Sequence, residues 1–444
     1  MRLVNIDRKT PMLMPPSIQD WVKEDDMAHF VLEAVNELSE SDCHLNWRGT
    51  GSRQYPPQMM MALLIYCYAH GVFSSRRIEA ATYRDVSVRF ITGDTHPDHD
   101  VIAAFRRSNY ELFVKCFVKV LELAKAMKIL QVGEVALDGT VLEANASKKR
   151  SLRQKEMEEQ SNALEKQIQE LIERAEEADA QESTRGDGTR LPAELSQAQQ
   201  RQKELKEAMA RLREQKSNRS QEREKEREDF DDEGPGHKPK QLEREVQEQD
   251  TINLTDPDAR LIPGKKGGFV AGYNAQIAVA ADTSAPLIVA TSVCDQSNDR
   301  KQLKPMGEKI MESQPQTRGI LVDTGYDNSA QIFDLEQKHG VTVYCPPEKK
   351  KQEAKEPVRY TKARKRTQEF RKAMAACIKS EFGKTCRQLR ATTVEPCFSW
   401  IKNTLGFTRF LLRGLPKVNL EWQLVCLACN VYHIHRLKIA RKIA

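Results

Sequence analysis

The chain has 444 residues, which is enough for two or three units that each bury a core of their own. Its residues are 39% hydrophobic and 30% charged, the mean hydropathy is −0.63 and the formal net charge is +6. No apolar run is long enough to cross a bilayer, and the first residues lack the pattern of a secretion signal. We therefore expect a cytoplasmic protein without a membrane partner, in which the ten cysteines stay reduced.

The positive charge is concentrated at one end of the chain. Residues 345–444 hold 23 Lys and Arg against seven Asp and Glu. A basic region of this kind favours a polyanionic partner such as nucleic acid, because each cation that meets a phosphate releases a counterion. A solvated basic surface without any partner is the alternative.

Residues 1–130 predict a helical amino-terminal domain of four or five helices. The stretch "SIQDWVKEDDMAHFVLEAVNELS" repeats apolar residues with a helical rhythm, and two prolines open the apolar "PPQMMMALLIYCYAHG". Arginine pairs on such a bundle, among them Arg106 and Arg107, are compatible with binding to DNA ends and equally with plain packing. His96 and His99 lie where we expect a turn that starts a helix, in preference to a metal site.

Residues 131–146 change to the rhythm of a β-strand. An apolar run there leads to Asp138 and then to a glycine, and the same order recurs in "GILVDTG", where the acid is Asp323. In α/β proteins, ligands and metals gather at the carboxyl ends of strands, so both acids are candidates for chemistry. Taken singly, each could equally be a turn or cap residue.

Residues 147–250 change composition abruptly to Glu, Gln, Lys, Arg and Ala. Apolar residues at spacings of three and four predict an antiparallel, coiled-coil-like helical hairpin that is inserted into the surrounding domain. We expect its charged end, "NRSQEREKEREDFDDEGPG", to be disordered. The hairpin is either an extension that packs on itself or an arm for dimerisation or for clamping DNA.

Residues 251–444 return to a globular pattern. Two β-rich runs, "GGFVAGYNAQIAVAAD" and "APLIVATSVCD", predict a β-hairpin. A helix, the strand that ends at Asp323, a second helix, the strand "VTVYCPP", a helix bearing Glu395 and a last apolar helix follow. Cys426 and Cys429 in that last helix are expected to be buried thiols, since no second pair accompanies them to complete a zinc site.

Without the hairpin, residues 131–146 and 251–444 follow the element order of a ribonuclease H-like fold. This is an α/β fold with a mixed sheet flanked by helices, and here an all-α domain would precede it. Asp138 would lie on the central strand, Asp323 on the strand beside it and Glu395 on a helix that crosses the end of the sheet. Three carboxylates at one point form an oxygen cage that suits two Mg²⁺ ions.

One motif narrows the choice among proteins that share this fold. In "TVEPCFSWIKNTLGFTRFLLRG", Glu395 precedes Lys402 by seven residues, so a continuous helix would carry both on one face. Over nearly its whole length, the chain resembles the DDE transposases of bacterial insertion sequences. The resemblance implies that Glu395 binds metal and that Lys402 holds a phosphate of the transposon end. The arginine of the family motif is replaced here by Ala391, which leaves Arg390 and Arg387 as the candidates for a phosphate contact.

The resemblance implies metal-dependent cleavage of DNA at the insertion-sequence ends and transfer of the 3′ hydroxyl strand into target DNA. Asp138, Asp323 and Glu395 would be the catalytic and metal-binding residues, with two Mg²⁺ or Mn²⁺ ions. The partners would be double-stranded DNA, as terminal inverted repeats and target, and a second copy of the chain, in a protein associated with the bacterial nucleoid. A catalytically inactive DNA-binding scaffold and a stand-alone Mg²⁺-dependent nuclease are the alternatives.

Overall fold

The computed structural model describes residues 17–36, 38, 54–180, 191–228, 245–264, 267–281, 283, 285–347 and 362–443. Contacts within the chain divide it into two compact units. Unit 1 comprises Met1–Ile129 and Leu424–Ala444, and unit 2 comprises Leu130–Gln423. Among the described residues, no helix is both long enough and apolar enough to cross a membrane.

Unit 1 is helical. Its helix α2 is apolar on every side and almost completely buried, as expected for the stretch that two prolines open. Asp98 caps helix α5 by accepting hydrogen bonds from the backbone N–H groups of Asp100 and Val101, in agreement with the predicted helix-starting turn. The elements of unit 1 before its carboxyl-terminal segment are η1 (Ile18–Trp21), α1 (Met27–Val35), α2 (Pro57–Ala69), α3 (Ser75–Arg84), α4 (Val86–Thr92), α5 (His99–Ser108) and α6 (Tyr110–Ala126).

Unit 2 is built around a six-stranded mixed sheet, which confirms the predicted α/β class. The central strand β1 pairs antiparallel with β5 on one side and parallel with β7 on the other, and β7 pairs parallel with β8. Both β4 and β6 pair antiparallel with the far edge of β5. The strands are β1 (Glu134–Glu143), β4 (Arg260–Pro263), β5 (Phe269–Ala280), β6 (Leu287–Cys294), β7 (Gly319–Leu321) and β8 (Thr342–Tyr344).

Helices pack against this sheet. Helix α9 contacts β6, and α12 contacts β1, β5 and β7. The indole of Trp422 on α13 is fully buried and donates a 2.9 Å hydrogen bond to the carbonyl of Gln276 on β5. The remaining elements are η4 (Thr324–Tyr326), α9 (Leu303–Ser313), α10 (Ser329–His339), α11 (Lys362–Lys379), α12 (Glu381–Ser399), the π-helix η5 (Trp400–Thr404) and α13 (Leu415–Ile443), which continues into unit 1.

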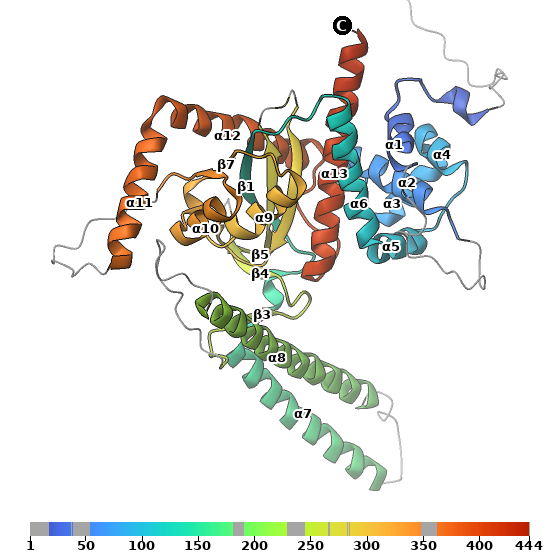
Figure 1. Cartoon of the computed structure of the whole chain (residues 1–444). Helices are drawn as coiled ribbons and strands as arrows, with labels where there is room; N and C mark the ends of the chain where they lie inside the picture. Colours follow the sequence, from blue (N-terminus) through green and yellow to red (C-terminus); the bar gives the residue numbers. More distant parts are fainter. Residues whose placement is uncertain are drawn as a thin grey trace, which may run out of the picture. The chain divides into compact units, whose positions relative to one another are not determined.

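A helical hairpin interrupts unit 2 after β1. Helices α7 (Gln154–Ala180) and α8 (Leu191–Glu228) lie side by side in Figure 1, as the composition predicts. Where the hairpin joins the rest of unit 2, β2 (Ser151–Arg153) and β3 (Thr251–Asn253) pair antiparallel in a small sheet that brings the two ends of the insertion together. Such closed ends explain why the fold tolerates a long insertion.

We expected the whole charged run of residues 218–236 to be disordered, and this expectation was wrong for residues 218–228. Helix α8 continues to Glu228. Its last turns form ion pairs with the rest of unit 2, since Arg219 pairs with Asp295 and Lys301 with Glu226 at 3.1 Å. Charge composition alone predicts solvation, whereas fixed partners of opposite charge stabilise the helix. Residues 229–236 of the run lie outside the described residues.

Candidate active site

Asp138 lies in the middle of β1, after three residues that are fully buried. One carboxylate oxygen accepts a 2.8 Å hydrogen bond from the backbone N–H of Gly139. The other accepts a 2.8 Å hydrogen bond from Nη1 of Arg390 on α12. The side chain is 21% exposed, so it can still be reached from solvent.

Asp323 lies beside Asp138 because their strands run in parallel. In that ladder Ala136 is opposite Leu321, and each aspartate follows its strand partner by two residues. The Asp323 carboxylate caps the short helix η4 by accepting a 2.8 Å hydrogen bond from the N–H of Gly325. The residue is therefore a cap as well as one of two acids at the same end of the sheet.

The two acids influence each other electrostatically. Burial raises the pKa of the Asp138 carboxyl above its ordinary value, and the negative charge of Asp323 raises it further. The guanidinium of Arg390 and the N–H of Gly139 act in the opposite direction without cancelling the rise. A carboxyl with a raised pKa beside a second acid is typical of functional sites.

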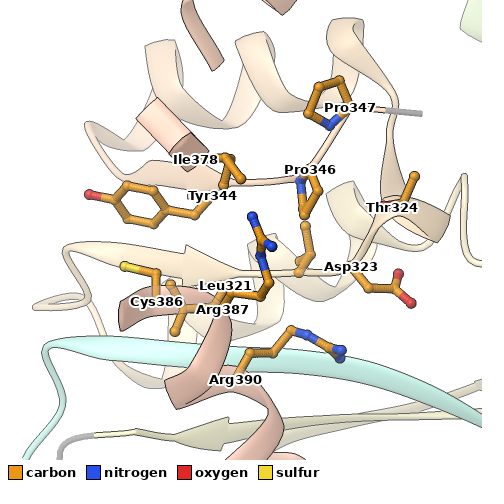
Figure 2. Close-up of a pocket in the computed structure, with 11 residues that line it drawn as sticks. Leu321, Asp323, Thr324, Tyr344, Pro346, Pro347, Ile378, Cys386, Arg387 and Arg390 are labelled. Carbon is orange, nitrogen blue, oxygen red and sulfur yellow. The ribbon is translucent and has the colours of Figure 1, made fainter. Parts of the chain in front are cut away.

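A pocket of about 540 Å³ opens next to Asp323. Figure 2 shows Arg387 and Arg390 reaching from α12 into the space beside Asp323, with Pro346 and Tyr344 on the opposite wall. One side of the pocket thus carries an acid and two cations, and the other side is apolar. The lining residues are Leu321, Val322, Asp323, Thr324, Tyr344, Pro346, Pro347, Ile378, Cys386, Arg387 and Arg390.

Glu395 is not gathered with the two aspartates. It is exposed on α12, and no group of three or more His, Cys, Asp or Glu in the described residues is arranged to hold a metal ion. Lys402 instead reaches β1, where its Nζ donates to Thr140 Oγ1 at 2.5 Å and to the carbonyl of Val141 at 2.9 Å. The expectation of one continuous helix was wrong, because the π-helix η5 begins at Trp400 and changes the angular spacing between the two residues.

A third acid, Asp299, lies close to the site and was missed. One of its oxygens accepts hydrogen bonds from the amides of Asn274 at 2.8 Å and Gln276 at 2.6 Å, both on β5. A Cβ at Gly139 would lie 2.5 Å from that oxygen, so any other residue there would displace the Asp299 side chain. Asp299 follows β6 by five residues, and the run "CDQSND" after a predicted strand was the available signal.

The two predicted arginines of unit 1 differ in their surroundings. Arg106 is only 5% exposed, and its guanidinium donates to the hydroxyl of Tyr68 at 2.7 Å and to the carbonyl of Phe73 at 3.0 Å. These bonds direct Arg106 into the core of unit 1, which argues against a contact with DNA. Arg107 is exposed and keeps that possibility.

Comparison with known proteins gives two family matches. A family model described as "Transposase DDE domain" matches residues 237–431, which include Asp323, Glu395 and the paired arginines of α12. A second, described as "Transposase domain (DUF772)", matches residues 16–108 in unit 1. No curated protein and no solved structure matches the chain.

Proposed function

Because the chain belongs to the DDE transposases of insertion sequences, we propose that it cleaves DNA at the ends of its element and joins the freed 3′ hydroxyl to target DNA. The observation that carries this proposal is the pair of Asp138 and Asp323 on adjacent parallel strands, with Arg390 bonded to the first and facing a pocket beside the second. Acids and arginines placed together are what a phosphodiester reaction requires.

The sheet supports a ribonuclease H-like catalytic unit. From the β6 edge to β8 its order is β6, β5, β1, β7 and β8. The pairs β6–β5 and β5–β1 are antiparallel, and the pairs β1–β7 and β7–β8 are parallel. In this arrangement the central strand and its parallel neighbour each deliver one aspartate to the same end of the sheet.

Asp138 and Asp323 fit a divalent cation by their chemistry, since carboxylate oxygens are the ligands that Mg²⁺ and Mn²⁺ prefer. Arg390 already compensates the charge of Asp138, which indicates that this position is built for a cation. In the proposal Asp138 and Asp323 hold the metal, and the family resemblance assigns the third position to Glu395, which is exposed on α12 and not gathered with them here. A bound pair of ions would activate the attacking water or 3′ hydroxyl and stabilise the leaving oxygen.

The arginines of α12 would position the DNA. Arg387 is exposed in the pocket, and its guanidinium can take a non-bridging phosphate oxygen in a bidentate contact. Arg390 would share its charge between Asp138 and the same phosphate. Lys402, which bonds β1 two residues beyond Asp138, would hold the next phosphate of the DNA strand.

The test uses purified protein, Mg²⁺ and labelled duplex DNA from both flanks of the gene. We expect the parent to nick at one defined position in each flank, and Asp323→Asn to bind the same DNA without a nick. Asp334→Asn is the matched control, since Asp334 is an exposed acid of unit 2 that pairs with Lys304 at the surface. A nick made equally well by Asp323→Asn would refute the proposal.

The alternatives predict different products. An inactive scaffold would bind the flanks and leave them intact in every variant. A stand-alone nuclease would nick, but no labelled 3′ end would become joined to a supercoiled target plasmid. A transposase gives the joined product, which is visible as labelled plasmid on the gel.

A further inference from the structure

Four basic side chains contact β1 and the residues that follow it, in the same order as the strand runs. We call them the cation row. Arg390 bonds the carboxylate of Asp138, Lys402 bonds Thr140 and Val141, Arg409 donates to Glu143 Oε2 at 3.0 Å, and Arg413 donates to the carbonyl of Asn145 at 2.9 Å. The cation row therefore begins at Asp138 and follows β1 to its carboxyl end.

Much of the positive charge in the cation row is not neutralised by these bonds. Lys402 and Arg413 donate to hydroxyl and carbonyl oxygens, which carry no net charge. The bonds of Arg390 and Arg409, by contrast, are made to carboxylates. Lys148, exposed a few residues beyond the strand, adds a further cation at the same end. The far end of the row is thus suited to an anionic ligand.

A hollow of about 540 Å³ lies at this far end. We call it the strand-end hollow. It belongs entirely to unit 2, and its polar groups include the amide of Asn145 and the ion pair of Arg409 with Glu143. Its lining residues are Glu143, Asn145, Ala146, Ser147, Lys148, Thr255, Phe269, Val270, Ala271, Arg409 and Arg413.

The ring of Phe269 is the apolar feature of the hollow. It is 57% exposed at the start of β5, although burial of such a ring is normally favourable. A single exposed phenylalanine would need no explanation. Here, however, it lies in one hollow with Lys148, Arg409 and Arg413, and an aromatic face among cations is the arrangement that binds unpaired nucleotides.

The distance between the two sites fits a continuous strand of DNA. Asp138 and Glu143 are five residues apart on one β-strand, which corresponds to roughly 16 Å. An extended single strand covers such a distance with a few nucleotides, and the contacts of Lys402 fall between the two ends. The odd separation places the side chains of Asp138 and Glu143 on opposite faces of the sheet, whereas Phe269 is an even number of residues from Ile277, the β5 partner of Asp138, and shares its face. A strand that leaves the acid pair along this face therefore reaches Phe269 at the end of the sheet.

We propose that the strand-end hollow binds unpaired nucleotides of the DNA strand whose phosphate lies at Asp138 and Asp323, with a base stacked on Phe269 and the phosphates along the cation row. The inference rests on the proposed function, which places DNA at the acid pair. Single-stranded DNA is favoured over intact duplex because a base offers its face to an aromatic ring only when it is unstacked from its neighbours.

The test measures DNA binding without cleavage. Full-length protein carrying Asp323→Asn is titrated, by fluorescence anisotropy, against a short labelled single strand, its blunt duplex, and that duplex with a short single-stranded overhang. We expect Phe269→Ala to weaken binding of the single strand and of the overhang about tenfold, and of the blunt duplex less than twofold. Phe269→Trp should bind as the parent does, since the aromatic face is kept.

Two further variants test which contacts cause any loss of DNA affinity. Tyr110→Ala is the matched control, because Tyr110 is also an exposed aromatic residue, at 50%, but lies in unit 1. It should change no affinity. Arg413→Gln should weaken all three probes and lower the slope of affinity against salt concentration by about one, as for the loss of one phosphate contact.

Equal binding of the single strand by Phe269→Ala and the parent would overturn the inference, and so would an equal loss for all three probes. Neither result bears on the proposed function, which depends on the nick made by the parent at the gene flanks. Conversely, Phe269→Ala could lose single-strand binding selectively while the parent makes no nick. That result would support binding of unpaired nucleotides in the strand-end hollow and would refute the proposed transposase chemistry.

Discussion

The contact between Arg390 and Asp138 is the most informative single interaction of the molecule. A guanidinium 2.8 Å from a carboxylate favours the charged form of the acid. Burial and the neighbouring Asp323 oppose it, and the pKa of Asp138 remains raised. Arg390 therefore limits the rise of the Asp138 pKa and favours the ionised form that a metal ligand must have.

We expect Arg390→Gln to slow nicking on the order of a hundredfold. It should also move the acid limb of the pH profile to higher pH, because the pKa of Asp138 rises further when its cation is removed. Nicking rates measured over a pH series test both effects. Arg387→Gln is the matched control: it lines the same pocket without a hydrogen bond to Asp138, so it should slow the reaction without moving the limb. An unmoved limb in Arg390→Gln would contradict this role.

The protonation of His433 makes the stability of the protein depend on pH. Burial, together with the charge of Arg436, lowers the pKa of His433 to about 4. In the unfolded chain the same group titrates near ~6.5. Between these values the unfolded chain binds a proton that the folded chain does not, so the free energy of unfolding falls as the pH drops from ~6.5 towards 4.

We expect a loss on the order of 2–3 kcal/mol from His433 over that interval, measured as a fall of the urea midpoint. In His433→Gln the dependence should flatten. It should not vanish, since burial also lowers the pKa of His435. A variant whose midpoint falls with pH as steeply as that of the parent would show that His433 is not responsible.

At the scale of elements, the sequence predicts best where local pattern and fold agree. Asp138 and Asp323 were singled out because each follows an apolar run, and the parallel pairing of β1 with β7 brings the two runs side by side. The β-hairpin of β5 and β6 was found because apolar runs with a turn between them pair with their neighbours.

The sequence predicts less well where a local irregularity decides the geometry. The spacing of Glu395 and Lys402 assumes a regular helix, whereas α12 contains Pro396 and passes into a π-helix at Trp400. The proline was the available signal of an irregular helix, but it does not predict the π-helix itself. Asp299 was missed for a different reason. It lies in a loop after β6, and only the tertiary hydrogen bonds to β5 bring it to the site.

Helix α11 is joined to the turn after Asp323 by a buried ion pair. Arg371 on α11 pairs with Asp327, whose side chain is only 2% exposed. We expect Arg371→Met to destabilise unit 2 by about 3–5 kcal/mol, because it leaves a buried carboxylate without this partner. Thermal unfolding and the rate of proteolysis within α11 measure the effect. Adding Asp327→Asn should restore much of the loss, and a double variant no more stable than Arg371→Met would contradict the explanation.

At the scale of the whole molecule, the chain inserts a long hairpin into its catalytic unit without interrupting the six-stranded sheet. The sheet uses strands on both sides of the insertion, since β1 precedes it and the other five follow. The two ends meet where Arg153 of β2 is opposite Thr251 of β3. A cluster that includes Met157, Leu205 and Ile252 covers this junction. The hairpin is thus attached through this contact region, through the ion pairs of α8 and through the amide of Gln215 on α8, which bonds Pro257, Asp258 and Arg260.

This arrangement predicts that unit 2 folds without the hairpin. Residues 154–250 can be replaced by Asn-Gly, which favours the tight turn between paired strands, together with Ile252→Thr because the cluster over it is lost. We expect cooperative thermal unfolding and unchanged nicking at single DNA ends.

Light scattering of the protein with end DNA then separates the two roles of the hairpin. An arm for dimerisation would leave one protein on each DNA in the shortened chain and two in the parent, whereas a self-packed extension would give equal stoichiometry. Loss of cooperative unfolding would instead show that the ion pairs of α8 with Asp295 and Lys301 are required for the fold of unit 2.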